Sequence, residues 1–288
     1  MEVHAVAVFG AGQMGSGIAQ VLARAEIEVV MVDVEQRFVD QGMASIAANL
    51  GRLAEKGKLP AAERDATLAR VRATTKPIEV AGCDLVIEAI IEDRKLKRDL
   101  FHELDAMLPR EVIFASNTSS ISITSLASAT KRAGRFVGMH FFHPVPVMKL
   151  VEVIRGAKTS GETVKLVTDL AVRLGKTPVE VRDFPGFVSN RLLMVYLNEA
   201  MKALQEGVAT KEAIDTVAKL GFNHPMGPLE LADYIGLDTC LNILEVLHEG
   251  FKDPRFEPSP ILRKMVENGF LGRKSGRGFY EYGGTSHA

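Results

Sequence analysis

The chain has 288 residues, of which 47% are hydrophobic and 25% charged, and its formal net charge is −1. This length suffices for two domains with buried cores, and the near-neutral charge balance disfavours nucleic acid or a membrane surface as a partner. Two cysteines are too few for a disulfide framework and are typical of a reducing compartment. We see no basic leader and no apolar run of about 18 residues, and we therefore expect a cytoplasmic protein.

The first part of the chain alternates short apolar runs with amphipathic stretches. Apolar runs at 4–9 and 27–33 flank a segment with helical spacing, which predicts a β-α-β unit. The segment 34–70 is longer than one crossover helix needs and predicts two helices, interrupted near 56–60. Later strands are predicted at 71–74, 84–90, 112–116, 135–141, 149–154 and 177–182, with helices at about 93–107 and 161–174. This alternation predicts a mainly parallel sheet covered on both faces.

The character of the sequence changes at "RDFPGFVSNR" (182–191), where Pro185 and Gly186 interrupt the pattern and strand signals nearly vanish. Helical stretches are predicted at about 187–206, 211–220, 228–249 and 259–269. The sequence therefore predicts an α/β domain at 1–184 and a helical domain at 185–288. The last six residues, 283–288, are expected to form a frayed tail.

A glycine motif, Gly10-x-Gly12-x-x-Gly15, directly follows the first predicted strand and opens a helix. In that context the glycines permit a tight turn and let the backbone approach a pyrophosphate closely. The N-terminus of the helix that follows favours anions. Asp33 stands at the end of the second predicted strand, where a carboxylate accepts hydrogen bonds from a ribose and repels a 2′-phosphate. The motif predicts a dinucleotide site that prefers NAD to NADP.

Polar residues follow two later strands, at the sheet edge where open α/β sheets bind ligands. Glu88 or Glu92 is a candidate to hold the nicotinamide ribose, and a capping or solvated carboxylate is the alternative. Asn117 and Ser119, in "ASNTSS", are candidate hydrogen-bonding groups toward cofactor and substrate, although an N-cap role also fits a single Ser or Asn.

The stretch "HFFHPVPVMKLVEVI" (140–154) combines His140, His143 and Glu152 with apolar residues. His140 at a strand end is a natural general acid/base, and Glu152 on the next strand is a candidate partner for its ring. These three side chains could instead bind a metal, but positions three apart in an extended chain face opposite sides. A hydrogen-bonded core histidine remains an alternative, more so for His143.

Two further features bear on substrate binding. Asn190 falls in the first turns of the predicted helix after "PGF", where its amide could reach a substrate carbonyl, or where it is a plain surface asparagine. The segment 51–76 has four more Lys and Arg than Asp and Glu, and it includes Arg52 and Lys56. That excess suits an anionic ligand with several phosphates, and a solvated helix face is the alternative.

Together these residues resemble the (S)-3-hydroxyacyl-CoA dehydrogenase family, in particular its short single-function 3-hydroxybutyryl-CoA dehydrogenases. The similarity covers essentially the whole chain and runs through "VAVFGAGQMGSGIAQ", "SNTSSISI", "GMHFFHPVPVMKLVEVI", "PGFVSNRLL", "PMGPLELADYIGLD" and "LGRKSGRGFYEY". It implies a Rossmann-type NAD-binding domain followed by an all-α C-terminal domain. It also implies NAD-dependent, reversible oxidation of a short (S)-3-hydroxyacyl-CoA to the 3-oxoacyl-CoA.

The resemblance assigns roles to single residues of this chain. It implies His140 as the acid/base with Glu152 as its partner, and Ser119 and Asn190 as hydrogen-bonding groups to substrate. It further implies that the C-terminal helices form a homodimer interface and that the helices after the second strand, with Arg52 and Lys56, receive the CoA moiety. The implied cofactor contacts are Gly10, Gly12, Gly15, Asp33 and Glu88, with Asn117 as a further candidate.

The chain departs from the family pattern at His143, where an asparagine is usual, and at Asp93, where an asparagine is common. His143 remains a candidate substrate contact. Short-chain dehydrogenases are excluded because no tyrosine is followed by lysine four residues on, and β-hydroxyacid dehydrogenases use a lysine where this chain has "PGFVSNR". A dehydrogenase of related build that acts on a free hydroxy acid stays open. A non-catalytic NAD-binding protein would not need His140, Glu152, Ser119 and Asn190 together.

Overall fold

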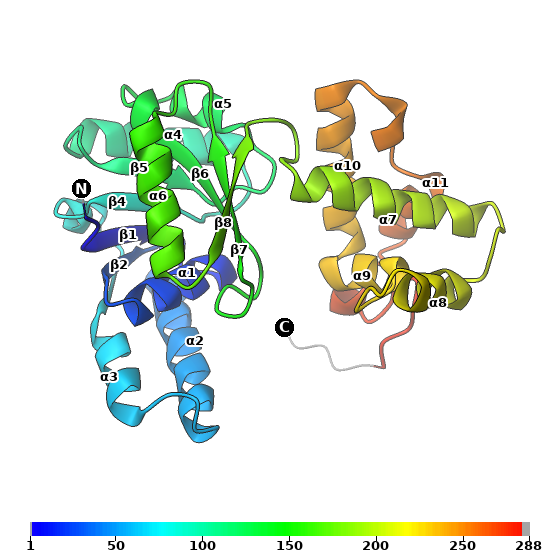
Figure 1. Ribbon diagram of the computed structural model, residues 1–288, viewed down its shortest axis with the longest axis horizontal. Helices are drawn as coiled ribbons and strands as arrows, with labels where there is room; N and C mark the ends of the chain where they lie inside the picture. Colours follow the sequence, from blue (N-terminus) through cyan, green and yellow to red (C-terminus); the bar gives the residue numbers. More distant parts are fainter. Residues whose placement is uncertain (1, 284–288) are drawn as a thin grey trace. The chain divides into compact units, whose positions relative to one another are not determined.

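The computed structural model describes residues 2–283, and the chain divides between Phe184 and Pro185 into two compact units. All eight strands in the described part of the chain belong to the first unit, and the second is helical (Figure 1). The α/β class with a helical second part, predicted from the sequence, is confirmed. Among the described helices, none combines the length and apolar character needed to cross a bilayer.

The first unit is built on one eight-stranded sheet with the order β3-β2-β1-β4-β5-β6-β7-β8. Neighbouring strands run parallel except β6 and β7, which pair antiparallel. The first six strands therefore point their carboxyl ends to one edge of the sheet, the edge at which such folds bind ligands. The strands are β1 (Ala5–Phe9), β2 (Glu28–Val32), β3 (Val71–Thr74), β4 (Leu85–Glu88), β5 (Ile113–Ser116), β6 (Phe136–Phe141), β7 (Leu150–Arg155) and β8 (Thr177–Arg182).

Helices cover both faces of this sheet, as the alternation of strands and helices predicted. One buried cluster joins α1, α2 and α6 to the strands through residues such as Ile18 and Val167. On the other face, Phe101 of α4 packs on Phe114 and Phe136, with ring centroids 5.5 and 4.6 Å away. The helices are α1 (Gln13–Arg24), α2 (Gln36–Glu55), α3 (Ala61–Ala69), α4 (Arg94–Met107), α5 (Ile123–Ala127) and α6 (Gly161–Arg173), with short 3-10 turns at Pro77–Val80 and Ala133–Arg135.

The second unit encloses its own apolar core, with Leu197, Leu237 and Leu244 fully buried. The single helix predicted at 228–249 is wrong, because the structure has two helices that meet at Gly236. Gly236 has φ 103°, a conformation that glycine adopts readily and that ends the helical path. The helices are α7 (Ser189–Gln205), α8 (Lys211–Gly221), α9 (Pro228–Ile235), α10 (Leu237–Phe251) and α11 (Pro260–Glu267), with 3-10 turns at Pro254–Phe256 and Arg273–Ser275. The predicted frayed tail lies outside the described residues except for Gly283.

Candidate active site

The glycine motif forms the turn between β1 and α1. Gly10 has φ 101°, and a Cβ there would lie 2.4 Å from the carbonyl oxygen of Ala89. A Cβ on Gly15 would lie 1.7 Å from the Gly10 carbonyl oxygen, so the helix can approach the turn only with glycine at this position. A Cβ on Gly12 would meet nothing within 4 Å, and no side chain caps the N-terminus of α1. The turn therefore presents open backbone and a helix N-terminus, which fits the phosphates of a dinucleotide.

Asp33 lies beside this turn, directly after β2. Its Oδ2 accepts a hydrogen bond from the backbone N–H of Ala11 at 2.7 Å, and its Oδ1 accepts one from Val34 at 2.7 Å. Both bonds hold the carboxylate at the end of β2, next to the turn that would receive the pyrophosphate. This is the place that recognition of an adenosine ribose requires.

Glu88 stands at a strand end, as the sequence predicted, but its side chain is not accessible. It ends β4 with no exposed surface, and its carboxylate forms a buried ion pair with Lys97 of α4. Ser116 Oγ donates to Glu88 Oε2 at 2.6 Å, and the Ile90 N–H donates to Oε1 at 2.8 Å. Both carboxylate oxygens are thus engaged inside the protein, and Glu88 has no exposed surface for the ribose contact expected from the sequence. Sequence reasoning missed Lys97, because nothing local predicts a buried lysine in a charged helix.

Glu92, the alternative, is the accessible carboxylate at this edge, with 38% of its side chain exposed. Its Oε1 accepts hydrogen bonds from Thr118 Oγ1 at 2.6 Å and from the Ser119 N–H at 3.0 Å, and Lys97 Nζ lies 3.2 Å from Oε2. Burial by itself would raise the pKa of Glu92, but the Lys97 charge and these hydrogen bonds outweigh it and lower the pKa. An ionised carboxylate therefore stands between the ends of β4 and β5.

The segment after β5 uses its polar side chains to join neighbouring strands. Asn117 Oδ1 accepts a hydrogen bond from the Phe141 N–H at 2.9 Å, which links the ends of β5 and β6. Ser119 Oγ lies 3.4 Å from Glu92 Oε1, so Ser119 is tied to the Glu92 carboxylate. The structure therefore brings Asn117, Ser119 and Glu92 together with the end of β6, which carries His140.

His140 and Glu152 face each other across the antiparallel pair β6–β7, where they are direct partners in the strand register. His140 Nδ1 lies 2.8 Å from Glu152 Oε2, and the two residues are 7% and 2% exposed. The ring of Phe142 packs against the imidazole, with centroids 4.6 Å apart. A buried carboxylate on Nδ1 fixes the orientation of the imidazole ring.

His143 follows β6 and is exposed, and partial desolvation lowers the pKa of its imidazole. Within residues 2–283, no three His, Cys, Asp or Glu side chains group as a metal site would require. Asn190 belongs to the second unit, where it is buried in the first turn of α7, and its N–H donates to the Gly186 carbonyl at 3.1 Å.

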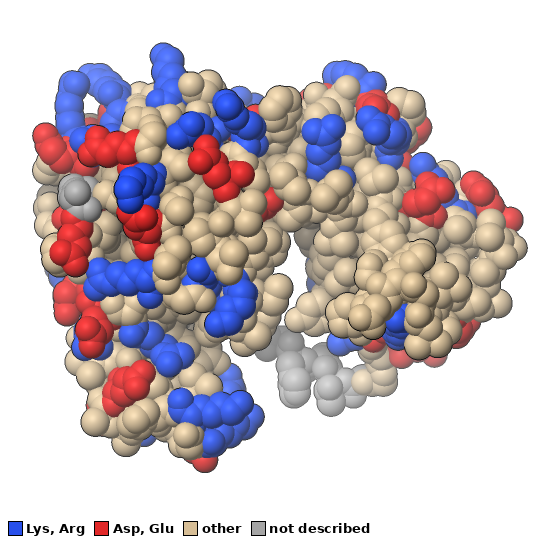
Figure 2. All heavy atoms as spheres, in the orientation of Figure 1, with Lys and Arg blue, Asp and Glu red and all other residues tan. Residues whose placement is uncertain are grey.

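The basic segment 51–76 spans the end of α2, all of α3 and β3. Arg52 and Lys56 lie at the C-terminal end of α2, where Figure 2 shows Lys and Arg side chains gathered on the surface. The Arg52 guanidinium donates a hydrogen bond to the Asn49 side-chain oxygen. This acceptor is neutral, so the bond does not neutralise the Arg52 charge. Arg64 pairs with Asp65 at 2.8 Å, so part of the positive excess is already neutralised within the segment.

Comparisons with known proteins identify the family of the chain. Residues 5–184 match the NAD-binding domain of 3-hydroxyacyl-CoA dehydrogenase, and residues 186–282 match its C-terminal domain. The chain is 58% identical to a probable 3-hydroxybutyryl-CoA dehydrogenase of Deinococcus radiodurans, over 96% of this chain and 99% of the relative. It is 51% identical to the 3-hydroxybutyryl-CoA dehydrogenase of Bradyrhizobium diazoefficiens, over 98% and 97%.

A solved structure with the same architecture is the (S)-3-hydroxybutyryl-CoA dehydrogenase of Ralstonia eutropha. It superposes with a TM-score of 0.96 at 49% identity, covering 98% of this chain and all of the other. The resemblance noted in the sequence is thereby confirmed. The chain belongs to the 3-hydroxyacyl-CoA dehydrogenase family and is an NAD-dependent enzyme.

Proposed function

We propose that this enzyme oxidises short (S)-3-hydroxyacyl-CoA thioesters, with 3-hydroxybutyryl-CoA as the preferred substrate, and catalyses the reverse reduction. The observation that carries the proposal is the buried pair of His140 and Glu152, with Nδ1 and Oε2 2.8 Å apart. It lies at the sheet edge that also carries the glycine turn and Asp33. The names of the relatives support the short acyl chain.

The mechanism assigns proton transfer to His140. Its Nε2 takes the proton of the substrate 3-hydroxyl in the oxidising direction and returns it to the developing alkoxide in reduction. Glu152 holds the ring through Nδ1 and stabilises the positive charge on the imidazole. Ser119 and Asn190 hold the substrate oxygens while charge develops. NAD, when bound, supplies the acceptor for the hydride from C3.

Cofactor binding follows from the first unit alone. Gly10, Gly12 and Gly15 let the pyrophosphate approach the N-terminus of α1, and Asp33 accepts hydrogen bonds from the adenosine ribose. At the end of β4 we assign the nicotinamide ribose to Glu92, whose carboxylate is 38% exposed, in place of Glu88.

Recognition of the CoA moiety is proposed for the end of α2. Arg52 and Lys56 are cations on this helix end, and a thioester of CoA brings several phosphate charges that a free hydroxy acid lacks. This feature separates the proposal from the alternative, a dehydrogenase of related build that acts on a free hydroxy acid.

The proposal is tested by the rate of NADH oxidation with acetoacetyl-CoA and with free acetoacetate. Both measurements are then repeated with NADPH in place of NADH. We expect turnover with the thioester and NADH, and kcat/KM for free acetoacetate lower by at least about two orders of magnitude. The matched variants Arg52→Ala and Lys56→Ala should raise KM for the thioester while kcat stays. A higher kcat/KM for free acetoacetate would contradict the proposal and would indicate a dehydrogenase of free hydroxy acids.

A homodimer through the helices of the second unit is part of the proposal. Leu192, Leu220 and Phe222 of this unit are 67%, 82% and 60% exposed, and exposed apolar side chains of this size are candidates for a subunit interface. Light scattering should give about twice the chain mass of 31.3 kDa, and Leu220→Asp should shift it toward the monomer. A monomeric wild-type protein would contradict the dimer. We also propose a cytoplasmic location, which fractionation of the native cells checks.

A further inference from the structure

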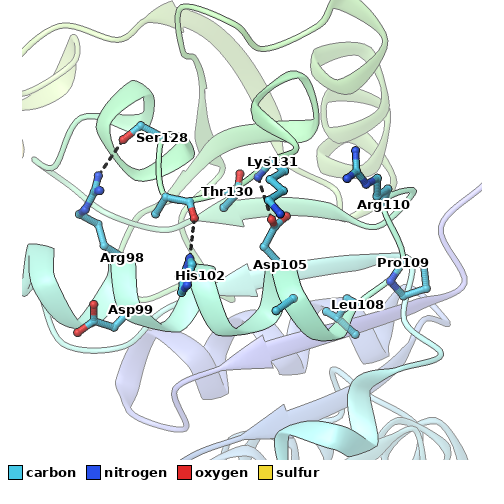
Figure 3. A pocket seen from close by; sticks show the side chains of 12 residues that line it. Arg98, Asp99, His102, Asp105, Leu108, Pro109, Arg110, Ser128, Thr130 and Lys131 are labelled. Atoms are coloured by element: carbon cyan, nitrogen blue, oxygen red, sulfur yellow. Dashed lines mark hydrogen bonds between the residues drawn. The ribbon is translucent and has the colours of Figure 1, made fainter.

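A hollow of about 780 Å³ lies on the first unit, away from the candidate active site (Figure 3). It is bounded by the second half of α4, by the turn at Pro109 and Arg110 that leads into β5, and by residues 128–131, which follow α5. These turns precede β5 and β6, so they lie at the amino ends of those strands. Ser119 and His140 lie at the opposite, carboxyl ends. None of the residues proposed for catalysis or cofactor binding lines the hollow.

Positive side chains are spread along this hollow. Figure 3 shows Arg98 at one end, Arg110 toward the other, and Lys131 between them. The Arg98 guanidinium donates to Ser128 Oγ at 2.9 Å and to a backbone carbonyl. Within residues 2–283, neither Arg98 nor Arg110 nor Lys131 forms an ion pair with a carboxylate. None of the three is therefore held in a direct ion pair, although the Lys131 charge helps to lower the pKa of Asp105.

Two aspartates also line the hollow, but cations outside it already pair with them. Asp99 lies 2.6 Å from Lys95 Nζ, and Asp105 Oδ1 lies 2.6 Å from Arg132 Nε. Burial by itself would raise the pKa of Asp105, yet the hydrogen bonds from Arg132 and from the Lys131 N–H outweigh it and lower the pKa. Both carboxylates already have cationic partners from outside the hollow, so the lining keeps an excess of positive charge.

The C-terminal end of α4 would repel an anion if its last carbonyls pointed into the hollow. Arg132, only 5% exposed, takes up these groups instead. Its guanidinium donates to the Asp105 carbonyl in the last turn of α4 at 3.2 Å, and to the Leu108, Pro109 and Val112 carbonyls just after the helix at 2.9, 2.6 and 3.1 Å. The Arg132 charge thus offsets the negative end of the α4 dipole beneath the hollow. The electrostatic potential of the hollow is then set mainly by its surface cations.

We propose that this hollow binds a nucleoside polyphosphate at a site separate from the active site. The volume of about 780 Å³ is in the range of small-molecule sites, and α4 between Arg98 and Met107 extends about 14 Å. Cations spread over that length match several linked phosphates better than one isolated anion. Ala106 and Pro109 are exposed and supply an apolar surface for a base.

Calorimetric titration of the full-length enzyme tests the site, with ATP as the probe and NADH present at saturation so that the cofactor site is filled. The double variant Arg110→Ala/Lys131→Ala removes two unpaired cations of the hollow. The matched control, Lys165→Ala/Lys264→Ala, removes two exposed lysines elsewhere on the surface. Turnover with acetoacetyl-CoA should stay unchanged in both double variants, which confirms that each is folded.

We expect one ATP per chain in the wild type, with binding at least about tenfold weaker in the Arg110/Lys131 variant and unchanged in the control. Inorganic tripolyphosphate should bind at the same site more weakly than ATP, since it lacks the base. Failure of the wild type to bind ATP at millimolar concentration would overturn the proposal. Equal weakening in both double variants would do the same, because it would show a response to net charge alone.

Discussion

The pairing of His140 with Glu152 yields a graded prediction for catalysis. Glu152→Gln keeps a hydrogen-bond acceptor beside His140 Nδ1, at a contact that is now 2.8 Å, but removes the negative charge. His140→Gln removes the acid/base itself. Both residues are buried, and the two side chains are of similar size to their replacements, so the surrounding packing should persist. The pair of variants therefore separates the charge of Glu152 from the chemistry of His140.

The magnitudes follow from the type of contact. A hydrogen bond that involves a charged group contributes about 1.5–3 kcal/mol, against about 0.5–1.5 kcal/mol for a neutral one. The loss of about 1.4 kcal/mol in Glu152→Gln should lower kcat about tenfold. His140→Gln should lower kcat by about 10²–10⁴, the range of general acid–base catalysis. Because Glu152 acts through His140, the double variant should be no slower than His140→Gln.

The assay is acetoacetyl-CoA reduction at saturating NADH, together with the NADH dissociation constant from fluorescence, which should not change. A matched control is Glu180→Gln on the neighbouring strand β8, a 48% exposed carboxylate that pairs with Arg155 and should leave kcat unaltered. Near-normal turnover in both His140→Gln and Glu152→Gln would refute the assignment. Losses that add in the double variant would refute the positioning role of Glu152.

Three further predictions concern cofactor choice and stability. Asp33→Ser should raise the ratio of NADPH to NADH efficiency by at least about tenfold, measured as kcat/KM, because a negative charge beside the 2′-phosphate is removed. Lys97→Met should lower the free energy of unfolding in urea by about 3–5 kcal/mol, since it leaves a buried glutamate unpaired, whereas Lys95→Met on the exposed side of the same helix should change it by less than about 0.5 kcal/mol. Because the pKa of Asp105 is lowered on folding, its pairing with Arg132 contributes stability above the unfolded value of about 3.9, and this contribution is lost as the pH falls through the lower folded value. Asp105→Asn should therefore be less stable at neutral pH and lose less stability on acidification, and an identical pH dependence in the two proteins would contradict the pairing.

The local pattern of apolar and polar residues was sufficient to predict most helices and strands of the first unit. Apolar periodicity located the strands, and the interruption near 56–60 correctly predicted two helices between β2 and β3. The short helix α5 was missed, because its five residues are too few to show a helical period. The division at Gly236 was also missed, since a single glycine in an apolar stretch fits either a continuous helix or a break.

The sequence by itself determined which residues could form the site, and the tertiary structure decided which of them meet. His140 and Glu152 were candidates from their types and strand positions, but only the β6–β7 register made them partners. Glu88 and Glu92 could not be told apart by spacing, and Lys97, folded back from α4, buried one and left the other accessible. Period and turn chemistry act over a few residues and can be predicted locally. Register, burial and ion pairing join distant segments, so they emerge only once the chain is packed.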